Sequence, residues 1–200
     1  GTYVNTPTLA QPALIVIDPN PSVRLDGTTE MIRVPDNDIF SFTDGNTDLP
    51  FSLEAWVMVD TLNTKQPIVG KTDENGSVTQ SEWLCNIRED GSIDSAIYTM
   101  DHGDNHQWFT AGGVFLPNVI YHVISTYGGA INTGRFYING VEVPVTYVNV
   151  GSFTRMFNTG SNVLLGARFI LAVSSRAWFD GVLDEVAIYD YELTPTQAFA

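Results

Sequence analysis

The chain has 200 residues and a mass of 22.0 kDa, a size that fits a single domain. Hydrophobic residues make up 44% and charged residues 16%, which excludes a disordered chain, and no apolar run is long enough for insertion into a membrane. The 9 Lys and Arg against 23 Asp and Glu leave a net charge of -14, which excludes nucleic-acid binding through phosphate contacts. The same acidity offers many oxygen ligands for calcium.

Short β-branched and aromatic runs, separated by turn residues, predict an all-β chain. Residues 1–11 are polar and rich in Thr and Pro, so we expect an N-terminal arm or linker there and one domain over residues 12–200. The predicted strands, in chain order, are Ala13–Ile17, Ser22–Leu25, Met31–Val34, Phe51–Val59, Pro67–Gly70, Trp83–Arg88, Ser92–Tyr98, Trp108–Ala111, Ile120–Tyr127, Arg135–Ile138, Val141–Val148, Val163–Gly166 and Gly181–Tyr189.

Turn dipeptides and alternation indicate how these strands are joined. Asp90-Gly91 and Asn139-Gly140 each separate two predicted strands and favour two-residue type I′ hairpins. In Phe51–Val59 every second residue is apolar, while the opposite face mixes Glu54 with Trp56 and Met58. One apolar and one mixed face indicate a two-sheet antiparallel sandwich.

The chain ends carry separate signals. Thr194, Pro195 and Gln197 form a capping-box pattern that predicts a short C-terminal helix. The chain begins at Gly1 with no basic and apolar leader, which suggests a processed product or a piece of a longer protein. The lone Cys85 cannot form an internal disulfide, so we expect it to pack as a small apolar residue.

Five blocks in order resemble the concanavalin A-like, laminin-G-like (LamG-like or pentraxin-like) jelly roll. They are Ser22–Gly27, Ile32–Asp36, Pro50–Val57, Gly134–Gly140 and Phe179–Asp190 followed by Leu193-Thr194. The resemblance spans nearly the whole chain and implies one concave and one convex antiparallel sheet. It also implies a structural calcium ion, and glycan or protein binding on the concave face or the rim loops.

Related jelly rolls include glycoside hydrolases with two carboxylates across the scissile bond. This chain lacks the acidic run of the glucanase relatives, and Asp184 and Glu185 are strand neighbours that point to opposite faces. His102 and His106 superficially resemble a zinc site, but Gly103 between them predicts a polar loop. We therefore expect a protein without catalytic activity.

The resemblance implies a candidate calcium site in this chain. Asp26 in the first block and Asp184 in the last match the family positions, with backbone carbonyls completing the shell. A second possibility is a rim site that uses Asp101, Asp104 and Asn105, or Asp73 and Asn75.

Sugar recognition needs aromatic faces beside planar polar side chains. The predicted ligand-binding residues are Asn86, Arg88, Tyr98, Trp108 and Arg135, which fall in strands expected to be neighbours. Strict alternation places Trp83 with Cys85 and Ile87 on the opposite face, so Trp83 is expected in the core. Trp56 and Trp178 are also assigned to packing.

These observations predict a carbohydrate-binding or cell-surface-binding module of a larger extracellular or virion protein. The alternative is a structural virion or surface-layer domain that docks on neighbouring subunits. A third possible function is that of a glycoside hydrolase. An extracellular, cell-surface or virion location follows from the first two. Because this architecture serves lectins, enzymes and adhesion domains, its fold does not decide between them.

Overall fold

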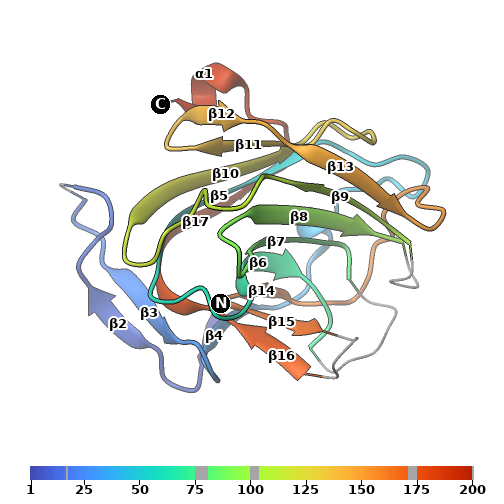
Figure 1. The fold of residues 1–200 in the computed structure, drawn as a ribbon. Helices are drawn as coiled ribbons and strands as arrows, with labels where there is room; N and C mark the ends of the chain where they lie inside the picture. The colour runs from blue at the N-terminus through green and yellow to red at the C-terminus, as the bar shows by residue number, and fades with distance from the viewer. Residues whose placement is uncertain (17, 75–80, 100–103, 171–174, 200) are drawn as a thin grey trace.

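The computed structural model describes residues 1–16, 18–74, 81–99, 104–170 and 175–199. Two large antiparallel sheets stack face to face, and both curve in the same sense, so one outer face is concave and the other convex (Figure 1). The concave sheet has eight strands, in spatial order β1 (Thr2–Val4), β4 (Met31–Val34), β14 (Val163–Leu165), β6 (Gln66–Lys71), β7 (Trp83–Ile87), β8 (Ile93–Tyr98), β9 (Asn105–Phe109) and β13 (Thr146–Val150).

The convex sheet has seven strands, in spatial order β12 (Val141–Val143), β11 (Arg135–Ile138), β10 (Ile120–Tyr127), β5 (Phe51–Val59), β17 (Asp180–Tyr189), β3 (Ser22–Asp26) and β2 (Thr8–Gln11). A separate hairpin joins β15 (Ala167–Ile170) to β16 (Ser175–Trp178), and a 3-10 turn, η1, spans Asp38–Phe40. The predicted all-β jelly-roll sandwich with a short C-terminal helix is confirmed.

Several predicted strands have the observed bounds, notably Phe51–Val59 and Ile120–Tyr127. The strand predicted over Ala13–Ile17 is wrong for the described residues 13–16, which bend and turn between Pro12 and Pro19. The strand predicted over Val141–Val148 divides in two, because Pro144 has no N–H for the ladder and the chain there crosses from the convex to the concave sheet.

Residues 1–11, expected as an arm or linker, add an edge strand to each large sheet. β1 pairs with β4 at the edge of the concave sheet, and β2 pairs with β3 at the edge of the convex sheet. The segment carries little apolar periodicity, and most of its residues are exposed. It is positioned by backbone ladder bonds, which side-chain patterns do not reveal.

The two predicted hairpins form with different turns. Asn139 and Gly140 have φ of 51° and 77°, the pair of positive values that a type I′ turn requires. At the other hairpin only Gly91 is left-handed, with φ 74°, and the Arg88 N–H bonds the Ser92 carbonyl across a longer loop. The type I′ prediction for Asp90-Gly91 is therefore wrong, although the hairpin exists.

The C-terminal helix α1 (Pro195–Ala198) has the predicted capping box. Thr194 accepts a hydrogen bond from the Gln197 N–H, and the Gln197 side chain bonds back to the Thr194 backbone. Leu193 and Ala198 pack against Ile124 and Tyr137 on the convex face. No helix among the described residues is long and apolar enough to cross a membrane.

The main core lies between the two sheets and is rich in aromatic rings. Phe42 stacks on Phe51 with ring centroids 4.5 Å apart, and Trp108 stacks on Tyr127 at 5.6 Å. Cys85 is buried in the same core, as predicted. This packing joins the inner faces of the two sheets, so only their outer faces can present side chains to a ligand.

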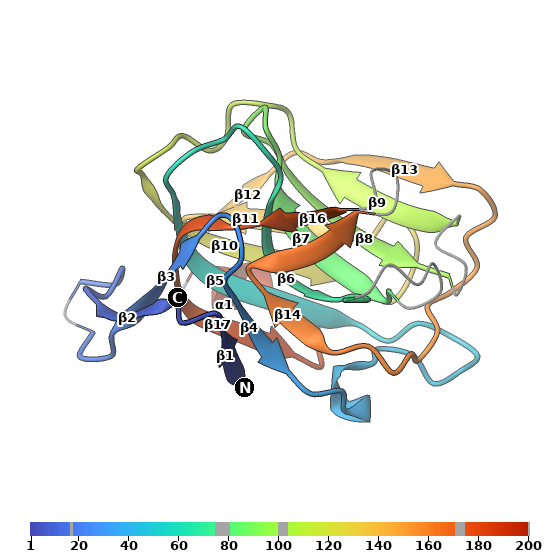
Figure 2. The ribbon, with the colours of Figure 1, turned by 90° about the horizontal axis from the view of Figure 1, so that it is seen from below.

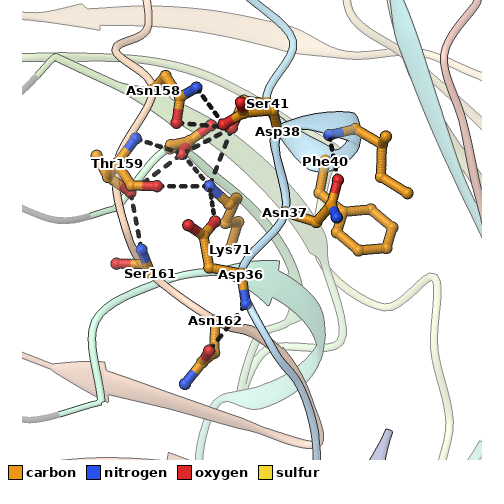
Figure 3. Close-up of polar contacts among 12 residues, drawn as sticks. Asp36, Asn37, Asp38, Phe40, Ser41, Lys71, Asn158, Thr159, Ser161 and Asn162 are labelled. Carbon is orange, nitrogen blue, oxygen red and sulfur yellow. Dashed lines mark hydrogen bonds and ion pairs between the residues drawn. The ribbon is translucent and has the colours of Figure 1, made fainter.

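One end of the core holds a buried ion pair. Lys71 shares the inner face of the concave sheet with Val163 and Trp83, the residues paired with it on either side. Its Nζ lies 2.5 Å from Glu82 Oε1, and both side chains have no exposed surface. The ammonium also contacts Asp36 Oδ1 at 2.8 Å and donates to the Thr159 carbonyl at 2.7 Å (Figure 3). Oxygen atoms of Asp36, Glu82 and Thr159 thus surround the Lys71 ammonium group.

The hairpin β15–β16 packs on the outer, concave face of the eight-stranded sheet (Figure 2). Ala167 and Trp178 at its base pack with Met31 and Leu164, in a cluster separate from the main core. The hairpin therefore covers part of the concave face near β14 and β6. The strands β7, β8, β9 and β13 lie to one side of it.

Candidate functional site

Sheet register decides which side chains share the concave face. Asn86 pairs with Asp94, and Asp94 pairs with Phe109, so these three residues point to one side. Gln107 lies two residues before Phe109 and points the same way. We call Asn86, Arg88, Asp94, Gln107 and Phe109 the concave patch.

Arg88 is the centre of the concave patch. Its Nε donates to Asp94 Oδ1 at 2.9 Å, and its guanidinium carbon lies 4.6 Å from the centroid of the Phe109 ring. The Arg88 side chain is 24% exposed, whereas that of Asp94 is 4% exposed. The ion pair and the ring hold the guanidinium in one orientation, with part of it open to solvent.

Amide side chains flank this ion pair. Asn86 Nδ2 donates to Asp94 Oδ2 at 3.4 Å, and Asn86 Oδ1 is buried with no hydrogen-bond partner among the described residues. Gln107 Nε2 donates to Asn105 Oδ1 at 2.6 Å. Planar amides, a guanidinium and a carboxylate beside an aromatic ring are the groups that bind adjacent sugar hydroxyls. Sequence reasoning missed Asp94, Gln107 and Phe109, although alternation from Asn86 across the register points to them.

Tyr98 also faces this side but lies deeper. It packs with Leu84 and Ala96, and burial raises the pKa of its hydroxyl, although the positive charge of Arg168 on β15 acts against that rise. The hairpin thus brings a second guanidinium to the Tyr98 end of the face. Arg168, which the sequence did not single out, is recognisable only once the hairpin is folded over the sheet.

Two of the predicted ligand-binding residues lie elsewhere. Trp108 pairs with Ser95, points into the core and has no exposed surface, so its assignment to the concave surface is wrong. Arg135 belongs to β11 of the other sheet, where it pairs with Glu142 at 2.9 Å. Asn86, Arg88 and Tyr98 share the predicted face, and alternation explains why Trp108 cannot.

The two predicted calcium ligands do not meet. Asp26 pairs with Asp180 across β3 and β17, which places it four residues, or about 13 Å, along the strand from Asp184. Asp184 instead accepts the Leu14 N–H at 2.8 Å and anchors the 12–16 loop. The prediction that Asp26 and Asp184 bind one calcium ion is therefore wrong, because the register between β3 and β17 holds the two residues apart.

Asp26 has a different role, as the acceptor of a turn. Its Oδ1 accepts the N–H groups of Thr28, Thr29 and Glu30, and its Oδ2 accepts the hydroxyls of Thr28 and Thr29. Burial acts to raise the pKa of Asp26, but these hydrogen bonds outweigh it and hold the pKa well below its usual range.

We expect Asp26 to contribute to stability against acid. Because its folded pKa lies below the unfolded value of about 3.9, the contribution is full above that pH and is lost as the pH falls toward the folded pKa. Urea unfolding between neutral and strongly acidic pH should show a shallower acid loss for Asp26→Asn than for the natural chain. Asp18→Asn is the control, since the Asp18 carboxylate accepts only the Asn20 N–H, at 2.8 Å, within the described residues. Parallel acid profiles for all three proteins would contradict this role.

The other predicted metal ligands lie partly outside the part of the chain that the structure describes. Asp101, His102 and Asn75 lie outside the described residues. His106 is buried, contacts Asn149 Oδ1 through Nδ1 at 2.5 Å and accepts the Asn132 N–H at Nε2, so both ring nitrogens are occupied. Within the described ranges no group of three or more His, Cys, Asp or Glu side chains could hold a metal ion.

The matching family model covers residues 26–198 and describes the concanavalin A-like lectin/glucanases superfamily. The chain belongs to this superfamily. No curated protein matches the sequence. The resemblance expected from the five sequence blocks is therefore confirmed, together with the jelly-roll fold.

Solved structures share this fold at low sequence identity. Domain 4 of AbnA, a GH43 extracellular arabinanase from Geobacillus stearothermophilus in complex with arabinotriose, has 20% identity and a TM-score of 0.56 over 98% of this chain and 80% of that one. The CBM40 of the Ruminococcus gnavus IT-sialidase, bound to α2,3 sialyllactose, has 11% identity and a TM-score of 0.65 over 89% and 94%. A chain from a structure that describes cell entry of botulinum neurotoxin type C, dependent upon interaction with two ganglioside molecules, has 15% identity and a TM-score of 0.65 over 99% of this chain and 44% of that one.

Proposed function

We propose that this chain is a non-catalytic carbohydrate-binding module that binds a glycan or cell-surface ligand through the concave patch. The observation that carries the proposal is the oriented Arg88 guanidinium, held between Asp94 and the Phe109 ring with part of its surface open. The superfamily and its carbohydrate-binding neighbours support the same class of function. We further propose that the module is part of a larger extracellular or virion protein.

Calcium remains a prediction of the family resemblance. An ion bound at about 100 times its dissociation constant would add about 2.7 kcal/mol to the free energy of unfolding. Its ligands would have to come from a set other than Asp26 with Asp184. Binding measurements in calcium and in chelator therefore belong in any test of the module.

The test is a glycan array that includes arabinotriose and α2,3-sialyllactose, probed with the folded chain in calcium and in chelator. For any glycan that binds, we expect Arg88→Ala to weaken binding about 10-fold to 100-fold, because a hydrogen bond to a charged group contributes about 1.5–3 kcal/mol. Arg24→Ala is the matched control, since Arg24 forms a partly exposed ion pair with Asp60 on the convex sheet. Equal binding by both variants would exclude the concave patch.

The alternative, a structural virion or surface-layer domain that docks on neighbouring subunits, remains a prediction. Under this alternative the concave patch binds no glycan. The chain, once shown to be folded, should then bind nothing on the array. The array therefore separates the two functions.

A further inference from the structure

A trough crosses the convex face beside the C-terminal helix. Its first hollow has a volume of about 770 Å³ and lies between the 12–16 loop, the strands β5 and β10, and the end of α1. A second hollow of about 390 Å³ shares Gly140 and Phe199 with the first, and a third of about 260 Å³ shares Tyr137 and Pro195 with the second. Each hollow adjoins the next, so we call the three together the α1 trough.

Exposed apolar side chains line the first hollow. Val16 is 84% exposed, Phe199 77% and Ile120 42%, and all three contribute to its walls. Phe199 stands between the first and second hollows and rests against the β11–β12 turn, where a Cβ on Gly140 would come within 3.2 Å of its ring. Single exposed apolar residues are ordinary, but several around one hollow mark an interaction surface.

The polar groups of the first hollow are already engaged with one another. Glu54 Oε1 contacts His122 Nε2 at 2.6 Å, and Tyr189 donates to Glu54 Oε2 at 2.5 Å. The hydrogen bond from His122 lowers the pKa of Glu54, with Tyr189 acting in the same direction, so the carboxylate is ionised at neutral pH. Trp56 stacks on the same His122 ring at 4.9 Å. The sequence assigned Trp56 to packing, yet it forms a wall of the hollow.

Tyr137 provides an unused donor. Its side chain is 2% exposed and lines the second and third hollows, but its hydroxyl has no hydrogen-bond partner among the described residues. Buried hydroxyls are nearly always hydrogen-bonded, and a carbonyl oxygen in the trough would satisfy this one.

The charge of the trough indicates a basic ligand. Glu54, Glu142 and Glu192 line it, and the one arginine in its lining, Arg135, is shared between Glu142 at 2.9 Å and Glu192 at 3.7 Å, so acidic groups outnumber it. The chain as a whole has a net charge of -14, which adds to the local negative potential.

We propose that the α1 trough binds an extended peptide segment of a partner protein. Two apolar side chains would occupy the first and second hollows on either side of Phe199, a backbone carbonyl would accept from Tyr137, and a Lys or Arg would lie beside the glutamates. A glycan suits the first hollow less well, because Leu14, Val16 and Ile120 offer no partner for sugar hydroxyls. This surface lies on the opposite face from the concave patch, so the two sites do not overlap.

The test uses an array of synthetic decapeptides in which two Leu, Phe or Trp residues at varied spacing are flanked by Lys. Matched arrays carry Glu in place of Lys, or Ser in place of the apolar residues. We expect binding to the Lys-containing apolar peptides alone, with an affinity that falls as salt rises. Phe199→Ala should weaken binding about 10-fold or more, and Tyr137→Phe, which removes only the hydroxyl, about 3-fold to 10-fold.

Arg88→Ala is the control on the opposite face and should bind the peptides as the natural chain does. Absence of peptide binding by the folded chain, or equal binding by the natural chain and Phe199→Ala, would overturn the proposal. A glycan that loses binding with Phe199→Ala but not with Arg88→Ala would identify the trough as a sugar site and would also overturn it. Failure of the glycan array alone leaves these peptide results unaffected, so the two functions are tested separately.

Discussion

Replacing Lys71 by methionine is expected to lower the free energy of unfolding by about 3–5 kcal/mol, because it leaves Glu82 buried without its ion-pair partner. The carboxylate has no exposed surface, so water cannot replace the ammonium without opening the core. Asp36 is 34% exposed and can regain water, so Glu82 bears most of the cost. Urea unfolding at neutral pH measures the difference.

The double variant Lys71→Met with Glu82→Met is the control for this cluster. Because it removes both buried charges, we expect it to recover most of the stability that the single variant loses. The backbone N–H of Thr159 would then lose its acceptor, Glu82 Oε1 at 2.7 Å, so recovery should be incomplete. A loss below about 1 kcal/mol in the single variant would mean that the ion pair is not desolvated in solution.

Replacing Trp108 by alanine should cost about 3–5 kcal/mol of unfolding free energy, as expected for removal of a buried tryptophan. The ring stacks on Tyr127 and lies near Phe136, and a Cβ on Gly134 would come within 2.3 Å of it. Circular dichroism during urea unfolding is the suitable measurement, since the change itself alters tryptophan fluorescence.

Phenylalanine at the same position is the graded control for Trp108. It retains an aromatic ring and removes the indole N–H, which has no hydrogen-bond partner among the described residues, so the loss should be well below that of alanine. A Trp108→Ala variant of unchanged stability that lost glycan binding would restore Trp108 to the ligand surface and contradict the core assignment.

The sequence by itself determined the fold class and much of the strand content. Strict alternation in Phe51–Val59, the Asn139-Gly140 turn and the Thr194 capping box are local patterns, and each has its expected structure. Five ordered blocks sufficed to indicate the superfamily, because block order along the chain is itself a sequence property. Alternation also predicted that Trp83 points inward, and it is fully buried.

Register and layer order were decided only by the tertiary structure. Asp26 and Asp184 occupy neighbouring strands, but the pairing of Asp26 with Asp180 sets them apart, and no local pattern states which residue lies opposite which. Trp108 and Arg135 were predicted in the binding surface, yet their positions depend on strand phase and on the sheet to which each strand belongs. The β15–β16 hairpin and the α1 trough likewise arise where distant segments pack together. Their side chains come together through long-range contacts, so only the folded chain reveals them.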